Sequence, residues 1–171
     1  MEFNQVIAQR YSCKKYSDRV VEDSKLQAIL EASRLAPTAK NLQEQKVYVI
    51  KSKALLEKID TITPCRYNAP VCLVVAFNKS NVFTYPGNER DSGIEDATIV
   101  ATHMILAAAN EKVDSCWINF FDPKKLKEAL NLPEEEEVLM MLDLGYAAQD
   151  AVMNPNHNKR KDLSETVVYL D

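Results

Sequence analysis

The stretch VCLVVAF, residues 71–77, is apolar at every position and has the length of one β-strand that is buried on both faces. Upstream of it, the β-branched segment 47–50 predicts another strand, and Leu55, Leu56 and Ile59 have the spacing of one helix face. Downstream, residues 138–144 form the last clear strand pattern. Strand, helix and strand therefore alternate around this central stretch.

Helical spacing of apolar residues also occurs in two segments near the N-terminus. The repeats are Phe3, Val6 and Ile7 in the first segment, and Leu26, Ile29 and Leu30 in the second. Pro37 should stop the second helix, because the residue before a proline disfavours the helical conformation. Each of the two predicted helices is followed by a polar stretch.

Residues 92–111 are unusually apolar for their length, with apolar side chains on most faces of the predicted helix. Such a helix is buried, either in the centre of the molecule or against another subunit. Residues 116–118 and 120–121 predict a further strand. Asp122 and Pro123 then have the pattern of an N-cap and a first helical position, so another helix should begin there.

The composition indicates one compact domain. At 171 residues with 46% hydrophobic content, the chain can form its own core. Four scattered cysteines without a CxxC pair, and no secretory leader pattern, favour a cytoplasmic protein with reduced thiols. The longest apolar stretches are well short of the roughly 18–20 residues that cross a bilayer, so no membrane segment is expected. A net charge of −4 argues against a nucleic-acid surface.

Several kinds of site are excluded or disfavoured. With only Gly87, Gly93 and Gly145, the chain cannot contain GxGxxG or a Walker phosphate loop. His103 lies in the apolar helix and His157 in the polar tail, and neither has metal-ligand spacing to a Cys or carboxylate. We therefore expect no metal site and interpret His103 as a buried, hydrogen-bonded histidine. A Cys–His nucleophile pair stays open, although no hydrolase signature supports it.

The first polar stretch, residues 10–16, contains Arg10, Ser12 and Lys14 at the end of the first helix. Two cations and a hydroxyl are a good donor set for a phosphate monoester. The alternative is an exposed basic turn without a ligand.

The second polar stretch, residues 36–43, places the backbone fixed by Pro37 beside the amide side chains of Asn41 and Gln43. Amides offer both donors and acceptors, which suits the edge of a heteroaromatic ring. The alternative is a helix stop with polar side chains.

The two stretches together resemble the nitroreductase family, whose opening pattern is R-x-S-x-R/K-x-F/Y followed by A-P-S/T-x-x-N-x-Q. The resemblance continues through residues 107–109, 115–118, 144–146 and 160–165, and so covers nearly the whole chain. This joint match is more specific than any one motif.

The resemblance implies an α+β fold, a three-layer α/β/α sandwich around a mainly antiparallel sheet, with residues 1–171 as a single domain. It also implies a homodimer with one FMN in each of two interfacial pockets. The tail from about residue 147 would reach the partner subunit, and the apolar helix at 92–111 would pack in the dimer core.

The same resemblance implies two sets of cofactor-binding residues. The phosphate and ribityl end of FMN would be held by Arg10, Tyr11, Ser12 and Lys14, with Arg160 of the tail as an additional cation and Lys159 or Lys161 as its alternatives. The isoalloxazine would meet Pro37, Thr38, Ala39 and Asn41 of the second subunit, and Gln43 would either reach its polar edge or help to shape the interface. One complete site would therefore need two chains.

Three positions depart from the family pattern. Glu44-Gln45 stands where many relatives have Pro-Trp, which removes an aromatic wall. Asn119-Phe120 stands where relatives often carry an acidic residue and a glycine whose backbone N–H approaches flavin N5, although Phe120 keeps that backbone donor. Lys14 replaces an arginine and loses its bidentate fork.

The implied activity is that of an FMN-dependent oxidoreductase, in which hydride passes from NADH or NADPH through FMN to a small electrophile, such as a nitroaromatic, quinone or enone. The flavin carries this chemistry, so we expect no catalytic acid or base. One alternative is a flavin-binding protein of the same fold without general reductase activity. Another is an α/β interaction domain that binds no flavin.

Overall fold

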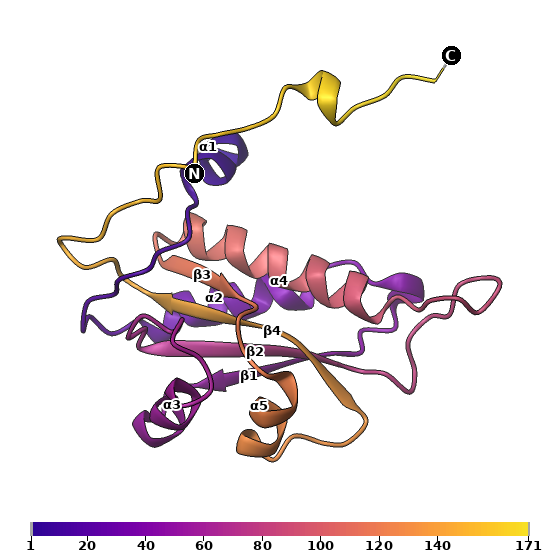
Figure 1. The fold of residues 1–171 in the computed structure, drawn as a ribbon, viewed down its shortest axis with the longest axis horizontal. Helices are drawn as coiled ribbons and strands as arrows, with labels where there is room; N and C mark the ends of the chain where they lie inside the picture. The colour runs from indigo at the N-terminus through magenta and orange to yellow at the C-terminus, as the bar shows by residue number, and fades with distance from the viewer. Residues whose placement is uncertain (1, 171) are drawn as a thin grey trace.

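The computed structural model describes residues 2–170 and shows a four-stranded antiparallel sheet between two helical layers (Figure 1). The strand order is β1-β2-β4-β3. The strands are β1 (Gln45–Ile50), β2 (Val71–Asn78), β3 (Asp114–Ile118) and β4 (Glu136–Gly145). The helices are α1 (Phe3–Gln9), α2 (Asp23–Arg34), α3 (Lys53–Asp60), α4 (Gly93–Asn110) and α5 (Pro123–Leu130), with short 3-10 turns η1 (Ala39–Asn41) and η2 (Leu163–Glu165). The predicted α+β three-layer class is confirmed.

The central strand β2 explains why the stretch at 71–77 is apolar throughout. Its residues alternate between the two layers: Leu73 and Val75 pack towards α2 and α4, whereas Cys72 and Val74 pack towards α3 and α5. Both faces are therefore buried, as expected for a strand without a polar side.

Helix α4 lies beside α2 on one face of the sheet (Figure 1). Ala97, Val100 and Met104 are fully buried, so one side of this helix belongs to the core. Ile94 is 55% exposed and Ile99 is also exposed. Within a single chain, one side of α4 is therefore buried in the core and another side is exposed to solvent.

The two ends of the described chain project from the layers (Figure 1). Phe3 of α1 is 65% exposed, and the tail after β4 is irregular apart from η2. Leu170, at the end of this tail, is 93% exposed. None of the helices within residues 2–170 combines the length and hydrophobicity that a membrane span requires.

The prediction that this strand includes residues 120–121 is wrong, because β3 ends at Ile118. Asn119 instead accepts a hydrogen bond from Trp117 Nε1 at 2.7 Å, and its carbonyl accepts the N–H of Phe121 at 3.0 Å. This turn leads directly to Asp122, whose carboxylate caps α5 as expected. Local hydrogen bonding therefore replaces strand pairing here.

Candidate functional site

The phosphate-binding stretch predicted at residues 10–16 lies along the edge strand β3. Ser12 bridges Ser115 in parallel, and the N–H of Cys13 donates to the Ser115 carbonyl at 2.9 Å. The side chains of Ser12 and Lys14 stay exposed while that of Cys13 is buried. The sheet edge thus fixes the backbone and leaves two of the predicted side chains open to a ligand.

The cations of this stretch differ in their partners. Lys15 forms an ion pair with Asp150. Among the residues that the structure describes, neither Arg10 nor Lys14 pairs with a carboxylate. The Lys14 ammonium lies 6.0 Å from the centroid of the Tyr67 ring. Two cations without a counter-ion in the described chain, in the same stretch as the Ser12 hydroxyl, fit the negative charge of a phosphate monoester, although Arg10 lines a different cavity from Ser12 and Lys14.

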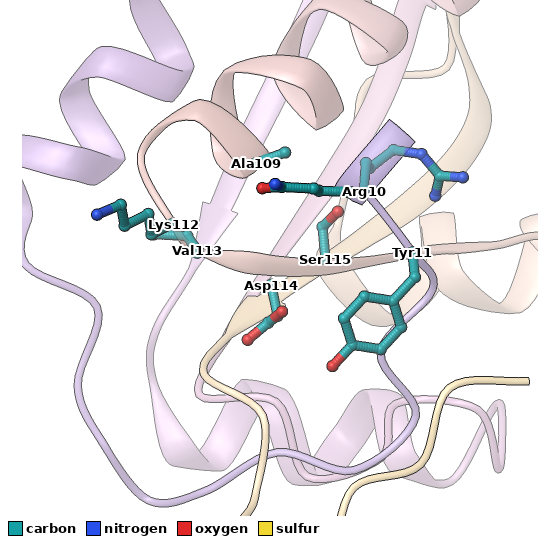
Figure 2. Close-up of a pocket in the computed structure, with 8 residues that line it drawn as sticks. Arg10, Tyr11, Ala109, Lys112, Val113, Asp114 and Ser115 are labelled. Carbon is teal, nitrogen blue, oxygen red and sulfur yellow. The ribbon is translucent and has the colours of Figure 1, made fainter. Parts of the chain in front are cut away.

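Arg10 and Tyr11 line a cavity of about 260 Å³ with the end of α4 and the start of β3. Figure 2 shows the Arg10 side chain directed away from the Asp114 carboxylate. Burial, and then the Asp114 charge, raise the pKa of the Tyr11 hydroxyl. Tyr11 also meets the His157 ring edge-on, with the centroids 6.5 Å apart. The side chain of Tyr11 is therefore a contact between the first polar stretch and the tail.

Two further cavities adjoin at Ser12 and Lys14. One, of about 270 Å³, is also lined by tail residues between Met153 and His157. The other, of about 280 Å³, extends to Asn119 and Phe120, and we call it the Lys14 cavity; its remaining lining residues are Cys65, Tyr67, Cys116, Trp117 and Ile118. The structure thus brings Ser12 and Lys14 together with Asn119 and Phe120.

Phe120 finds room where the family pattern often has glycine. Its side chain is 72% exposed, and its carbonyl accepts a hydrogen bond from Thr63 Oγ1 at 2.6 Å. The backbone at this edge of the Lys14 cavity is therefore held in place while the ring points out of the core.

The amide loop at residues 36–43 is attached to the first turn of α4. Asp96 accepts the N–H of Ala39 at 2.8 Å through one carboxylate oxygen and the Ser92 hydroxyl at 2.8 Å through the other. Asn41 and Gln43 have left-handed backbones, with φ of 56° at each. Two internal hydrogen bonds brace the loop: Gln43 N–H to Thr38 Oγ1 at 3.1 Å, and Gln43 Nε2 to the Asn41 carbonyl at 3.1 Å. Asn41, Gln43 and Pro37 are nonetheless exposed.

The two predicted sets lie at opposite ends of α4. Ala39 is bonded to Asp96 in the first turn, whereas Arg10 shares a cavity with Ala109 in the last turn. At about 1.5 Å per residue, these turns are roughly 20 Å apart along the helix. Strand order agrees, because the amide loop precedes the edge strand β1 and residues 10–16 lie against the opposite edge, β3. One chain does not bring the two sets together.

Among the described residues, the predicted tail cation makes no hydrogen bond with the first stretch. Arg160 is exposed, and its guanidinium donates to the carbonyls of His157 and Lys159. His103 is half-buried, which corrects the expectation of full burial; its Nδ1 lies 2.9 Å from the Ile99 carbonyl oxygen. In the described part of the chain, no three His, Cys, Asp or Glu side chains are grouped to hold a metal ion.

Sequence reasoning missed Asp96, Cys65 and Tyr67. Asp96 reads only as an acidic residue in the first turn of a helix, a common helix feature. Cys65 and Tyr67 belong to the connection before β2, and they reach the Lys14 cavity only because that connection folds back over β3. No local pattern marks either position.

Comparison with known proteins gives a consistent result. The protein-family sequence model described as "Nitroreductase family" matches residues 7–66 and 61–146 of this chain. A protein of Archaeoglobus fulgidus named "Putative NADH dehydrogenase/NAD(P)H nitroreductase" is 30% identical over 149 residues, which is 82% of this chain and 83% of that protein.

Two solved structures from Clostridium difficile are similar over nearly their whole length. A nitroreductase family protein of strain 630 has 35% identity and a TM-score of 0.92, with 99% of this chain and 98% of that chain covered. An FMN-dependent nitroreductase of strain R20291 has 27% identity and a TM-score of 0.77, with 98% and 99% covered. The chain therefore belongs to the nitroreductase family, a class of FMN-dependent oxidoreductases, as its two N-terminal stretches predicted.

Proposed function

We propose that this chain binds FMN between two copies of itself and passes hydride from NADH or NADPH to a small electrophile of the nitroaromatic, quinone or enone class. The observation that carries the proposal is the separation of its two binding stretches along α4. Each stretch is preformed and exposed, yet each holds only half of the groups that FMN needs. A second copy of the chain supplies the other half.

The residues fit FMN in chemical type. Arg10, Ser12 and Lys14 offer a hydroxyl and two cations, which have no carboxylate partner within residues 2–170, to the phosphate and ribityl end. The amide loop of the second copy offers Asn41 and Gln43 to the polar edge of the isoalloxazine. Bound FMN supplies the hydride chemistry, while the protein binds and orients it and leaves one face open to nicotinamide and acceptor in turn.

Exposed apolar side chains support the homodimer. Phe3 of α1, Ile94 of α4 and Leu170 of the tail are each more than half exposed. Contiguous exposed apolar surface marks interaction sites, and Leu170 belongs to such a run with Val168 and Tyr169. We propose that these segments pack against the partner subunit, and that the tail from about residue 147 carries Arg160 to one of the two FMN sites.

The proposal also includes a cytoplasmic location. Cys13, Cys65, Cys72 and Cys116 form no disulfide in the described chain, which is in keeping with a reducing compartment.

Absorption and steady-state assays test the function directly. The purified protein is expected to be yellow, with the spectrum of oxidised flavin, and to oxidise NADH or NADPH faster when a quinone such as menadione is added. Flavin retained without any acceptor-dependent oxidation would favour the flavin-binding alternative. A colourless protein that takes up no added FMN would overturn the proposal.

A further inference from the structure

We infer that Tyr67, in the Lys14 cavity, contacts the isoalloxazine ring of FMN, and that Arg66 is the positioning residue that holds Tyr67 there. This inference rests on the proposed FMN site. Tyr67 lines this cavity together with Lys14 and Phe120, and it comes from the connection between α3 and β2.

The backbone at Tyr67 has an unfavourable conformation. Tyr67 has φ of 50° and Asn68 has φ of 61°, so both are in the left-handed region. Asparagine tolerates this region through its short polar side chain, whereas a bulky aromatic residue does so at a cost in free energy. Such residues persist where the surrounding structure holds them, and they cluster at ligand sites.

The surrounding structure that holds this turn is centred on Arg66, which is only 3% exposed. Its Nε donates to Asp60 Oδ1 at 2.8 Å, and its Nη1 donates to the Ala69 carbonyl at 2.8 Å. Nη1 also lies 3.6 Å from Oδ1 of the buried Asp143. The N–H of Ala69 returns a hydrogen bond to the Arg66 carbonyl at 2.9 Å. Both ends of the turn that contains Tyr67 are therefore fixed.

Neither oxygen of Asp143 has a hydrogen-bond partner in the described chain, although both are buried. A buried carboxylate in this state needs an explanation, because each unpaired polar group costs free energy. Within the described residues, Arg66 is the cation that forms an ion pair with it. We explain the buried Arg66–Asp143 pair by its effect on the turn. Arg66 lies between Cys65 and Tyr67 in the sequence, and both of these neighbours line the Lys14 cavity, so fixing Arg66 fixes them.

Tyr67 presents a ring and a donor to the cavity. Its ring lies near the Lys14 ammonium, at a distance that allows a cation–π contact. Burial, and then a hydrogen bond with the Cys65 thiol, raise the pKa of the Tyr67 hydroxyl to about 12. The phenol keeps its proton at neutral pH, and rotation of this O–H from the Cys65 thiol towards the cavity would let it donate to an oxygen or nitrogen acceptor of an isoalloxazine.

FMN titration of the apoprotein tests the role of Tyr67, with flavin fluorescence quenching as the readout. Tyr67→Ala is expected to weaken FMN binding about tenfold or more, because it removes the ring and the donor together. Tyr67→Phe keeps the ring and should lose about twofold to tenfold, with a shift in the absorption spectrum of bound flavin. Asn68→Gly is the matched control in the same turn, and wild-type affinity is expected for it.

A double-mutant cycle tests the positioning role of Arg66. Asp60→Asn removes one charged partner of Arg66 at the surface and leaves Asp143 paired, so the fold should be retained. It is expected to weaken FMN binding a few-fold in the wild-type background and to have almost no further effect in Tyr67→Ala, because the hydrogen bond acts through Tyr67. Equal losses in both backgrounds would contradict this role.

The outcomes distinguish this inference from the proposed function. If the wild-type apoprotein binds FMN and both Tyr67 variants bind it equally well, Tyr67 does not contact the ring, while the proposed function stands. If the wild-type apoprotein binds no FMN, the proposed function itself is wrong. If Tyr67→Ala fails to fold, Tyr67→Phe and Asp60→Asn decide the question.

Discussion

The affinity for FMN is expected to fall between about tenfold and a hundredfold in Arg10→Ala protein. A charge-assisted hydrogen bond to a phosphate contributes about 1.5–3 kcal/mol, and each 1.4 kcal/mol is a factor of ten. Arg10 has no carboxylate partner among residues 2–170, so its removal should cost the fold little. Isothermal titration of FMN into the apoprotein measures the change.

Lys15→Ala provides the matched control for Arg10→Ala. Lys15 lies in the same stretch, but it is exposed and pairs with Asp150. Its loss removes a similar charge without removing a proposed phosphate ligand, and FMN affinity close to that of wild type is expected. Equal losses in the two variants would mean that only the general charge of the stretch matters.

The largest expected loss of stability is that of Arg66→Met. The substitution leaves the Asp143 carboxylate buried without its cation, and breaking a buried pair in this way costs about 3–5 kcal/mol. Urea denaturation at pH 8, followed by circular dichroism, should show the difference in the free energy of unfolding between the variant and wild type.

The loss of stability in Arg66→Met is expected to depend on pH. Burial raises the pKa of Asp143 well above its usual value, and the Arg66 charge opposes that rise. Without Arg66 the folded-state pKa rises further, whereas the unfolded value stays at about 3.9. A carboxyl with a raised folded-state pKa lowers stability as pH rises from the unfolded towards the folded value. The difference from wild type should therefore widen as pH rises above the wild-type folded-state pKa of Asp143.

A double variant checks the cause of this loss. Arg66→Met with Asp143→Val replaces the pair by apolar side chains, which is often neutral for stability when a buried pair is removed as a unit. We expect most of the lost stability to return and its extra pH dependence to disappear. A double variant as unstable as Arg66→Met alone would show that the loss comes from the hydrogen bonds to Asp60 and Ala69 instead.

The parts of the fold that could be predicted are those whose sequence pattern is compatible with only one kind of secondary-structure element. The apolar run at 71–77 is β2 because each side chain meets one of two helical layers. Asp122 and Pro123 begin α5 because an N-cap is a local feature. Residues 120–121 look equally strand-like by propensity, but strand formation depends on tertiary context, and the turn at Asn119 prevails.

Residues of the candidate site could be proposed from the sequence only where they stand in motifs. Arg10, Ser12 and Lys14 share a short stretch, and the family pattern identified it together with the amide loop. Arg66 and Tyr67 carry no such signal, because the burial of Arg66 depends on Asp143, which is distant in sequence and adjacent only in the folded chain. A buried arginine is rare enough that composition gives no reason to expect one.

The separation of the two stretches means that one chain alone does not place both of them around a single FMN. Asp96 fixes the amide loop at one end of α4, and β3 fixes residues 10–16 at the other. Both halves are ordered by their own chain, so each subunit would offer two preformed half-sites. Dimerisation would then complete two identical pockets with little rearrangement.

A mixed dimer of Arg10→Ala and Asn41→Ala subunits tests this central claim most directly. If each pocket takes Arg10 from one chain and Asn41 from the other, the heterodimer has one pocket with both substitutions and one wild-type pocket. The expected result is a single FMN bound per dimer with wild-type affinity, and a second bound far more weakly. Two equally impaired pockets in the isolated heterodimer would contradict the account.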